Sequence, residues 1–182
     1  QDRNTCILFG DGAGAAVLGL ADAAQQQADR GVLSVHLYAD GTQAESLSIP
    51  GGGSRYPTSA QTLAAGQHFI HMAGKVIFTH AVRNLASACQ AALKHQGLRP
   101  ADIDLVVAHQ ANLRIVEALA QRLDLPMDKF FINISKYGNT SSASVPIALD
   151  EAVRAGRVKP GDRLLFCALG AGLAWGSACL RW

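Results

Sequence analysis

Two polar residues, His109 and Asn139, have the types and the positions of groups that could act on a carbonyl. His109 directly follows the apolar run Ile103–Ala108, and Asn139 follows a second apolar run. Each lies where a strand is predicted to give way to a helix, and ligands collect at such strand ends in α/β sheets. A neutral imidazole that donates from Nε2, beside an amide that donates from its NH₂ group, suits a thioester enolate. The residues alone leave open a core histidine and a helix-capping asparagine.

A third group with suitable chemistry is the turn Gly170-Ala171-Gly172, which follows another predicted strand. Its small residues let a ligand approach the backbone, and a backbone N–H suits a developing oxyanion. A histidine and an asparagine placed in this way normally serve a nucleophile. No convincing nucleophile precedes them, so the chain resembles half of an active site.

The other thiols and imidazoles favour a structural interpretation. The cysteines have apolar neighbours and no close paired spacing, and none is predicted at a helix N-terminus, where the dipole would favour a thiolate; they are Cys6, Cys89, Cys167 and Cys179. Buried reduced thiols are therefore expected, with a nucleophilic role for one of them as the alternative. His68 and His71 are three residues apart on a predicted helix, but no further ligand stands nearby, and no metal site is expected.

The composition limits the kind of protein. The chain has 182 residues, 49% of them hydrophobic, which suits one domain or a large half-domain with a real core. With 16% charged residues and a net charge of +2, a general nucleic-acid binder is not expected. No long apolar run predicts a membrane span and the start lacks a secretory signal, so a soluble, cytoplasmic protein is expected. The first residue is not Met, which suggests a chain cut from a longer protein.

Strands and helices are predicted to alternate along the chain. Apolar runs between turn residues predict strands at Thr5–Phe9, Ala15–Leu20, Val32–Tyr38, Ile103–Ala108, Phe130–Ile134, Arg163–Leu169 and Leu173–Leu180. Helical spacing predicts helices over residues 63–95, divided or bent at Gly66 and Gly74, and over residues 113–123 and 142–155. Residues 10–14 are interpreted as a hairpin turn rather than a nucleotide-binding loop, and residues 39–62 as a long loop. The alternation predicts a layered α/β fold.

Four motifs, in order along the chain, resemble β-ketoacyl-acyl-carrier-protein synthase III. They are Phe9-Gly10-Asp11-Gly12-Ala13-Gly14, His109-Gln110-Ala111-Asn112-Leu113-Arg114-Ile115, Gly138-Asn139-Thr140-Ser141, and Gly170-Ala171-Gly172 followed by Trp175-Gly176-Ser177. The resemblance covers nearly the whole chain and matches the C-terminal half of the family. It implies a thiolase-like layered αβαβα fold, of which residues 1–182 would form one half, with a mixed five-stranded sheet and helices.

The resemblance also implies an activity. In this family a cysteine takes an acyl group from acyl-CoA, and a histidine and an asparagine then promote decarboxylative condensation with malonyl-acyl-carrier protein. That reaction yields β-ketoacyl-acyl-carrier protein and initiates fatty-acid synthesis. The half that holds the nucleophilic cysteine would be absent from residues 1–182, so the chain alone is expected to be inactive. No cofactor is implied, because acyl-CoA and malonyl-acyl-carrier protein are substrates.

Several residues receive roles from the resemblance. His109 and Asn139 would be catalytic, and the N–H of Ala171 would help to hold the oxyanion. The substrate-binding residues would be Asn112 and Arg114 along the pantetheine passage, Gly74 and Phe78 as channel lining or gate, and Leu169 beside the catalytic centre. Leu169 stands where some members have Phe, and Ala171 replaces the central glycine of a Gly-Gly-Gly turn. Ala keeps the N–H, so oxyanion stabilisation should survive if its φ is negative.

The expected partners are acyl-carrier protein, acyl-CoA and a second copy of the chain, because a homodimer is implied by the resemblance. Neither nucleic acid nor a membrane is an expected partner. Two alternatives remain open from the sequence. One is a related condensing enzyme of secondary metabolism with another acyl donor. The other is a non-catalytic dimerising fragment, which the missing nucleophile would explain. A half built to pack against another half should also leave a large apolar face exposed.

Overall fold

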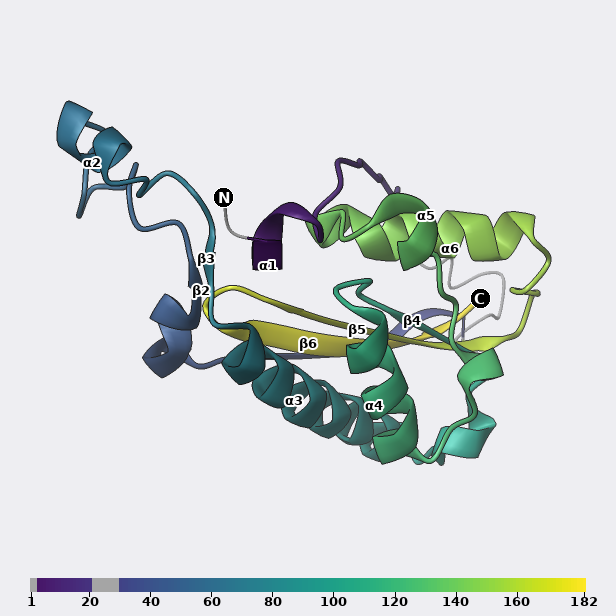
Figure 1. Ribbon diagram of the computed structural model, residues 1–182. Coiled ribbons are helices and arrows are strands. Elements are labelled where there is room, and N and C mark those ends of the chain that lie inside the picture. The colour runs from purple at the N-terminus through teal and green to yellow at the C-terminus, as the bar shows by residue number, and fades with distance from the viewer. Residues whose placement is uncertain (1–2, 21–29) are drawn as a thin grey trace.

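The computed structural model describes residues 3–20 and 30–182, and its centre is a mixed sheet with helices against both faces (Figure 1). The strands of this sheet follow the order β1-β6-β5-β4 and are β1 (Gly31–Ala39), β4 (Leu105–Ala108), β5 (Arg163–Gly170) and β6 (Ala174–Arg181). β6 is antiparallel to both β1 and β5, whereas β5 is parallel to β4. The carboxyl ends of β4 and β5 therefore lie at the same edge of the sheet.

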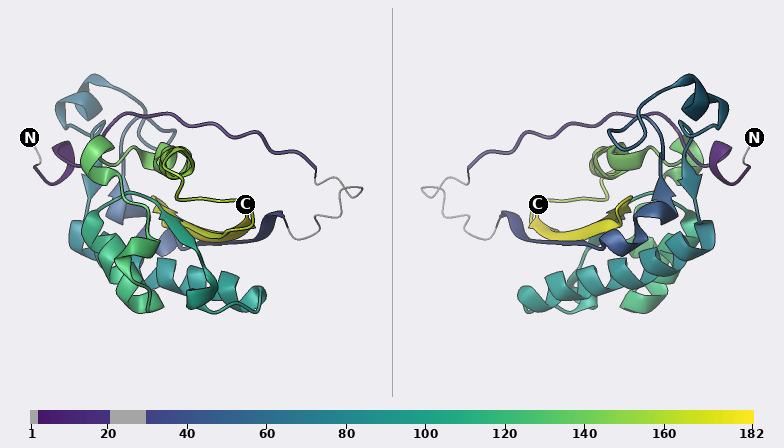
Figure 2. Two further views of the ribbon diagram at one scale, coloured as in Figure 1. Left: turned by 90° about the vertical axis from the view of Figure 1, so that its right-hand side faces the viewer. Right: turned by 90° about the vertical axis from the view of Figure 1, so that its left-hand side faces the viewer.

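Three longer helices cover the sheet. α3 (Gly74–His95) and α4 (Leu113–Leu123) lie on one face, and α6 (Ser144–Arg154) lies on the other (Figures 1 and 2). The shorter elements are α1 (Arg3–Cys6), η2 (Gly41–Ser46), β2 (Leu47–Ser48), α2 (Ala60–Ala64), β3 (His71–Met72), η3 (Pro100–Asp102), η4 (Met127–Lys129), α5 (Ile134–Tyr137) and η5 (Ser141–Ala143). The predicted layered α/β arrangement is confirmed.

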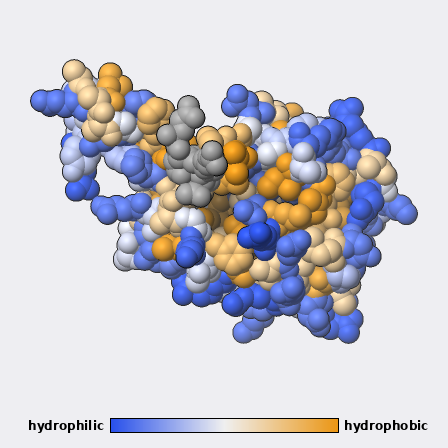
Figure 3. Space-filling model, in the orientation of Figure 1, coloured by the Kyte–Doolittle hydropathy of each residue, from blue (hydrophilic) through white to orange (hydrophobic). Residues whose placement is uncertain are grey.

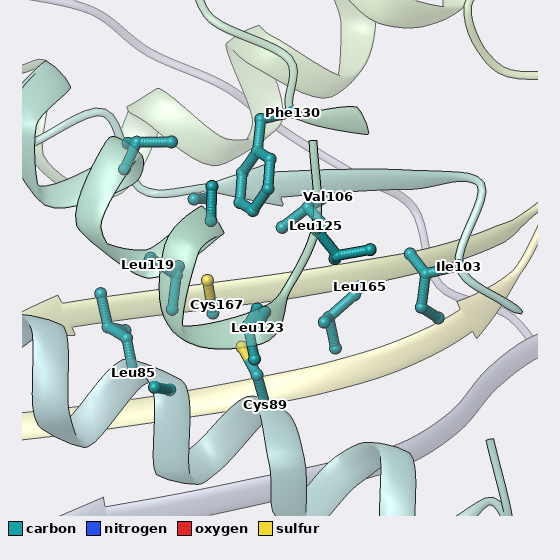
Figure 4. Close-up of a cluster of buried hydrophobic side chains, with 14 of the residues drawn as sticks. Leu85, Cys89, Ile103, Val106, Leu119, Leu123, Leu125, Phe130, Leu165 and Cys167 are labelled. Atoms are coloured by element: carbon teal, nitrogen blue, oxygen red, sulfur yellow. The ribbon is translucent and has the colours of Figure 1, made fainter. Parts of the chain in front are cut away.

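Strand alternation divides the core into two clusters, one on each side of the sheet. Val106 and Leu165 point toward α3 and α4, where they meet Leu119 and Leu123 (Figure 4). Leu105 and its neighbours on the opposite face pack against α6. β4 is buried along its whole length because it has helices on both sides, as an uninterrupted apolar strand requires.

The predicted strand Phe130–Ile134 is wrong. Phe130 forms a single parallel bridge with Val106, and the N–H of Phe131 donates to the Val106 carbonyl at 3.1 Å. Pairing stops there because the side-chain amide of Gln110 bonds the next backbone groups, and the chain then turns into α5. Within the described residues the sheet accordingly has four strands, instead of the five expected of a mixed five-stranded sheet.

The predicted N-terminal hairpin is also wrong. The segment Thr5–Phe9 begins inside α1, and only Phe9 forms a bridge, with Asn139; residues 10–20 contain no strand and run out as an extended trace (Figure 2). The glycines at positions 10–14 do not form a tight turn. They allow close approach, because a Cβ on Gly10 would lie 2.1 Å from the Tyr137 carbonyl oxygen and one on Gly14 would lie 2.5 Å from Pro146.

The region before α3 differs from the helical prediction over residues 63–95. α2 ends at Ala64, Gly66 has a positive φ of 68°, and the chain then enters the short strand β3, so His68 and His71 do not share a helix. Gly74 is the first residue of α3, which agrees with a break at this position. The long loop over residues 39–62 contains η2 and β2, which were not predicted.

The remaining strands and helices agree with their predicted positions within two residues, namely β1, β4, β5, β6, α4 and α6. α4 shows why the prediction works: Ile115, Val116, Leu119 and Leu123 are buried on one side of the helix at the spacing of an amphipathic helix. None of the helices in the described ranges is long and apolar enough to cross a membrane.

Candidate active site

His109 and Asn139 line one cavity of about 1030 Å³ at the carboxyl ends of β4 and β5. Asn112, Leu169 and Ala171 line it as well, so five of the predicted site residues share this space. Most of the remaining wall is apolar, with Val35, Leu37 and Tyr38 of β1 and Phe166 of β5 among its residues. Hydrophobic residues gather toward the middle of the face seen in Figure 3, with hydrophilic residues around its outline. A cavity of this kind suits a mostly apolar ligand oriented by a few polar groups.

His109 is held at the end of β4 by its backbone and by its ring. Its N–H donates to the carbonyl of Cys167 at 2.8 Å, which continues the parallel β4–β5 pairing by one residue. Its Nδ1 lies 2.6 Å from the Oγ of Ser144 in α6. Burial lowers the pKa of His109 from 6.5 to about 4, so the imidazole is neutral at physiological pH.

The hydrogen bonds of Ser144 indicate which ring nitrogen carries the proton. Ser144 is 2% exposed, and its Oγ accepts a hydrogen bond from the N–H of Gln110 at 3.2 Å. Within the described chain, His109 Nδ1 is the remaining partner of this hydroxyl, so the buried O–H donates to Nδ1. The proton of the neutral imidazole is then on Nε2. That nitrogen becomes the donor available to a ligand, as expected from the sequence.

Asn139 is fixed in a comparable way. Its Oδ1 accepts the N–H of Ser141 at 2.9 Å, which leaves the amide NH₂ group without a protein partner in the described residues. Its backbone N–H donates to the Leu8 carbonyl at 2.8 Å, and its carbonyl accepts the Gly10 N–H at 3.0 Å. The segment around Phe9 therefore holds the main chain of Asn139, while the side chain presents a donor to the cavity.

The backbone around Asn139 is unusual. Gly138 has a φ of 70°, and Ser141 has a φ of 54°, so left-handed residues stand on both sides of Asn139. A Cβ at position 138 would lie 3.1 Å from the Leu8 carbonyl oxygen, so glycine is required both by its φ and by this contact. Positive φ at a non-glycine residue is a strained conformation that often occurs at functional sites.

Ala171 lies in the turn between β5 and β6, at the edge where β4 also ends, and it lines the cavity. Asp124 and Ser141 are the non-glycine residues with positive φ in the described ranges, and Ala171 is not one of them. The φ of Ala171 is therefore not positive, so its backbone N–H can serve as a donor despite the added Cβ. Whether this N–H binds an oxyanion stays a prediction.

The other predicted substrate residues divide into two groups. Asn112 is the N-cap of α4, where its Oδ1 accepts the Arg114 N–H at 2.9 Å, and it faces the cavity together with Leu169. Arg114, Gly74 and Phe78 are exposed and do not line it. Arg114 is the second residue of α4, the helix that begins at the cavity, whereas the other two lie in the first turns of α3. Their roles stay predictions.

Three of the four cysteines are buried, and one of them, Cys167, also lines the cavity. Cys89, Cys167 and Cys179 are buried together between α3 and the sheet. A hydrogen bond with Cys167 and burial raise the pKa of the Cys89 thiol, and burial raises the pKa of Cys179. Cys6 was predicted to lie in a strand and to be buried, and both predictions were wrong: it ends α1 and is exposed. No group of three potential metal ligands lies within the described ranges.

Two residues that orient His109 were not predicted from the sequence. Ser144 lies within the predicted helix over residues 142–155 and received no role there, and Gln110 was noted only as part of a motif. Gln110 is 1% exposed. An amide side chain two residues after a buried strand is a signal that could have revealed its structural role.

Comparisons with known proteins agree with this geometry. The family "3-Oxoacyl-[acyl-carrier-protein (ACP)] synthase III C terminal" matches residues 93–182, and "3-Oxoacyl-[acyl-carrier-protein (ACP)] synthase III" matches residues 1–41. The chain belongs to the β-ketoacyl-acyl-carrier-protein synthase III family. The predicted family and its thiolase-like fold are thus confirmed. Members of the synthase III family in Roseiflexus sp. RS-1 and Caldanaerobacter subterraneus are each 50% identical over all 182 residues, which are 54% of either relative.

Solved structures of synthase III give the same result. The enzyme of Aquifex aeolicus matches with a TM-score of 0.87 and 41% identity, over 100% of this chain and 53% of that one. The Thermus thermophilus enzyme matches with a TM-score of 0.86 and 44% identity, over 100% of this chain and 54% of that one. The chain spans about half the length of the curated relatives it matches, and it corresponds to their C-terminal part.

Proposed function

We propose that the chain supplies the decarboxylating part of the active site of a β-ketoacyl-acyl-carrier-protein synthase III, an acyltransferase that initiates fatty-acid synthesis. The observation that carries the proposal is that His109 Nε2 and Asn139 Nδ2 are both free to donate and belong to residues that line one cavity. Two neutral donors in an apolar space stabilise an oxyanion without paying for a change of charge on the protein.

In the proposed reaction, the two donors bind the thioester carbonyl oxygen of malonyl-acyl-carrier protein. When the bond to the carboxylate breaks, CO₂ leaves and the electron pair moves into the enolate, whose oxygen accepts both hydrogen bonds. The enolate carbon then attacks an acyl thioester, and the thiolate of the acylated cysteine departs to give β-ketoacyl-acyl-carrier protein. Neutral His109 suits this role, because an imidazole with a pKa of about 4 donates without being ionised.

The nucleophilic cysteine would come from the part of a full-length enzyme that residues 1–182 do not cover. Large hydrophobic side chains that such a part could cover are exposed here, among them Val17 (100%), Leu18 (83%) and Leu37 (78%). β1 forms one edge of the sheet and brings Leu37 into the cavity wall. The whole enzyme would use acyl-CoA and acyl-carrier protein and work as a homodimer in the cytoplasm. Sedimentation of the isolated chain tests whether this exposed apolar surface makes the chain associate. A monodisperse monomer would contradict that expectation.

The catalytic roles are tested in the full-length enzyme by measuring two half-reactions separately. His109→Ala and Asn139→Ala should each suppress malonyl-acyl-carrier-protein decarboxylation, while transfer of a radiolabelled acyl group from acyl-CoA to the cysteine stays largely intact. His68→Ala is the matched control, because His68 is exposed and does not line the cavity. Equal loss of both half-reactions in the two variants would contradict the division of roles.

A second candidate is a priming condensing enzyme of secondary metabolism. A priming β-ketosynthase of the R1128 polyketide pathway matches with a TM-score of 0.74 and 36% identity, over 83% of this chain. Acyl preference depends on the shape of the pocket, to which Leu169 contributes here. Assays of the full-length enzyme across acyl-CoA lengths separate the two candidates: preference for acetyl-CoA over all longer chains favours fatty-acid initiation.

A further inference from the structure

We propose that Glu151 is a positioning residue for the two donors of the site, although it does not line the cavity. The inference rests on the proposed function and assigns a role to a carboxylate in the second turn of α6. Glu151 would hold the segment that carries Asn139, and the buried side-chain amide of Gln110 would extend the same support to His109.

The first step is the set of contacts that Glu151 makes. Its carboxylate accepts a hydrogen bond from Asn133 Nδ2 at 2.9 Å and one from the Tyr137 hydroxyl at 2.6 Å, and it also pairs with the Lys136 ammonium group. All three donors come from α5 or from its N-cap. A helix of four residues has almost no stability of its own, so a shared acceptor for its donors determines where it lies.

The second step leads from α5 to Asn139. The N–H of Gly138 donates to the Ile134 carbonyl at 2.7 Å and closes the helix, and Asn139 is the next residue. One residue therefore separates the Tyr137 side chain on Glu151 from the amide that donates to the cavity. Gly138, with a φ of 70°, is the single residue that joins α5 to Asn139, so a shift of α5 reaches Asn139 through this one link.

The third step leads from Asn133 to His109. The N–H of Asn133 donates to Gln110 Oε1 at 3.1 Å, while Gln110 Nε2 donates to the carbonyls of Ala108 at 2.9 Å and Phe131 at 3.1 Å. Every polar group of this buried side chain is thus used. Gln110 adjoins His109 in sequence. Asn133 therefore bonds Glu151 through its side chain and bonds Gln110, the neighbour of His109, through its backbone N–H.

The charge state of Glu151 agrees with this role. Hydrogen bonds from Lys136, Tyr137 and Asn133, in that order, lower its pKa to about 2, so three donors meet an ionised acceptor at any physiological pH. A partly exposed ion pair contributes little to global stability. The distinctive property of the cluster is its geometry, because one carboxylate gathers three donors from five consecutive residues that end two residues before Asn139.

The test uses the full-length enzyme with Glu151→Gln and the matched control Asp150→Asn. Asp150 precedes Glu151 in the same helix, is exposed, and bonds the Arg154 side chain four residues on. In Glu151→Gln an amide NH₂ group replaces one carboxylate oxygen, and it cannot accept hydrogen bonds from the side-chain donors of α5 and its N-cap. We expect malonyl-acyl-carrier-protein decarboxylation to fall about 10- to 100-fold in kcat, as for a small misplacement of catalytic groups, with KM changed less. Cysteine acylation and the melting temperature should match those of the control.

Two further variants make the outcome decisive. Tyr137→Phe should lower decarboxylation by itself and add little in the Glu151→Gln background, because both changes release the same segment. If Glu151→Gln equals Asp150→Asn while His109→Ala and Asn139→Ala still suppress decarboxylation, the positioning role is refuted and the proposed function stands. If His109→Ala and Asn139→Ala leave decarboxylation intact, the proposed function itself fails. Parallel loss of both half-reactions and of thermal stability in Glu151→Gln would show a merely structural role and overturn the inference.

Discussion

Replacing Ser144 with Ala removes one oxygen atom and tests how the imidazole of His109 is set. That oxygen accepts the N–H of Gln110 at 3.2 Å and donates to His109 Nδ1 at 2.6 Å. After the change both groups remain in a buried place without their partner. A buried polar group that loses its partner costs about 1–3 kcal/mol, so the two together should lower the free energy of unfolding by about 2–6 kcal/mol.

The same change should alter the titration of His109. The Ser144 hydroxyl stabilises the neutral ring by donating to Nδ1, and a protonated Nδ1 could not accept that bond. Ser144→Ala should therefore raise the pKa of His109 above its value of about 4 and weaken the preference for the Nε2–H tautomer. Nitrogen-15 NMR of the imidazole measures both quantities, and urea denaturation measures the loss of stability.

Ser142→Ala is the control for these experiments, because Ser142 is exposed and lies two residues away, in the turn η5 before α6. It should leave the imidazole spectrum unchanged and alter the free energy of unfolding by less than about 0.5 kcal/mol. The reasoning is refuted if the unmodified chain carries its proton on Nδ1. It is equally refuted if Ser144→Ala leaves tautomer, pKa and stability as they are.

Three other perturbations have definite expected outcomes. Because folding lowers the pKa of His109 from 6.5 to about 4, the free energy of unfolding should fall by up to about 3 kcal/mol as pH falls from 6.5 to 4. His109→Gln should make the free energy of unfolding depend less on pH in urea denaturation. Gly138→Ala should lower the melting temperature and speed amide exchange at Asn139, since its Cβ would approach the Leu8 carbonyl; unchanged exchange would speak against it. Leu119→Ala, in the core, should cost about 2–5 kcal/mol in chemical denaturation, and Leu113→Ala, 42% exposed, much less.

The parts of the fold that were predicted from the sequence are those in which a local pattern is sufficient. β4 is a short apolar run between turn residues, and α4 has its apolar residues three and four apart, so each pattern specifies one element and one buried side. The placement of His109 followed from the end of β4. The expectation that a ligand site lies at strand ends agrees with the cavity, which lies at the carboxyl ends of β4 and β5.

The supporting residues of the site could not be found in this way, because their roles arise from contacts between distant segments. Ser144 is 35 residues from His109, and Glu151 is 18 residues from Asn133, whose side chain it binds. Serine before a helix and glutamate within one are ordinary in sequence. Only the packing of α6 against the end of β4 shows that they bond the groups around the cavity.

Two of the three wrongly predicted strands, over residues 15–20 and 130–134, have a common physical cause. An apolar run becomes a strand only where a neighbouring strand accepts its backbone hydrogen bonds, and side-chain pattern gives no information on that neighbour. At Phe130 the pairing with β4 ends after one bridge, because the Gln110 amide takes the next carbonyl and N–H. Residues 15–20 have the pattern of a strand, yet no strand of the described chain pairs with them, and Leu18 stays 83% exposed. In both places the hydrogen-bond partner, rather than the hydrophobic pattern, determined the structure.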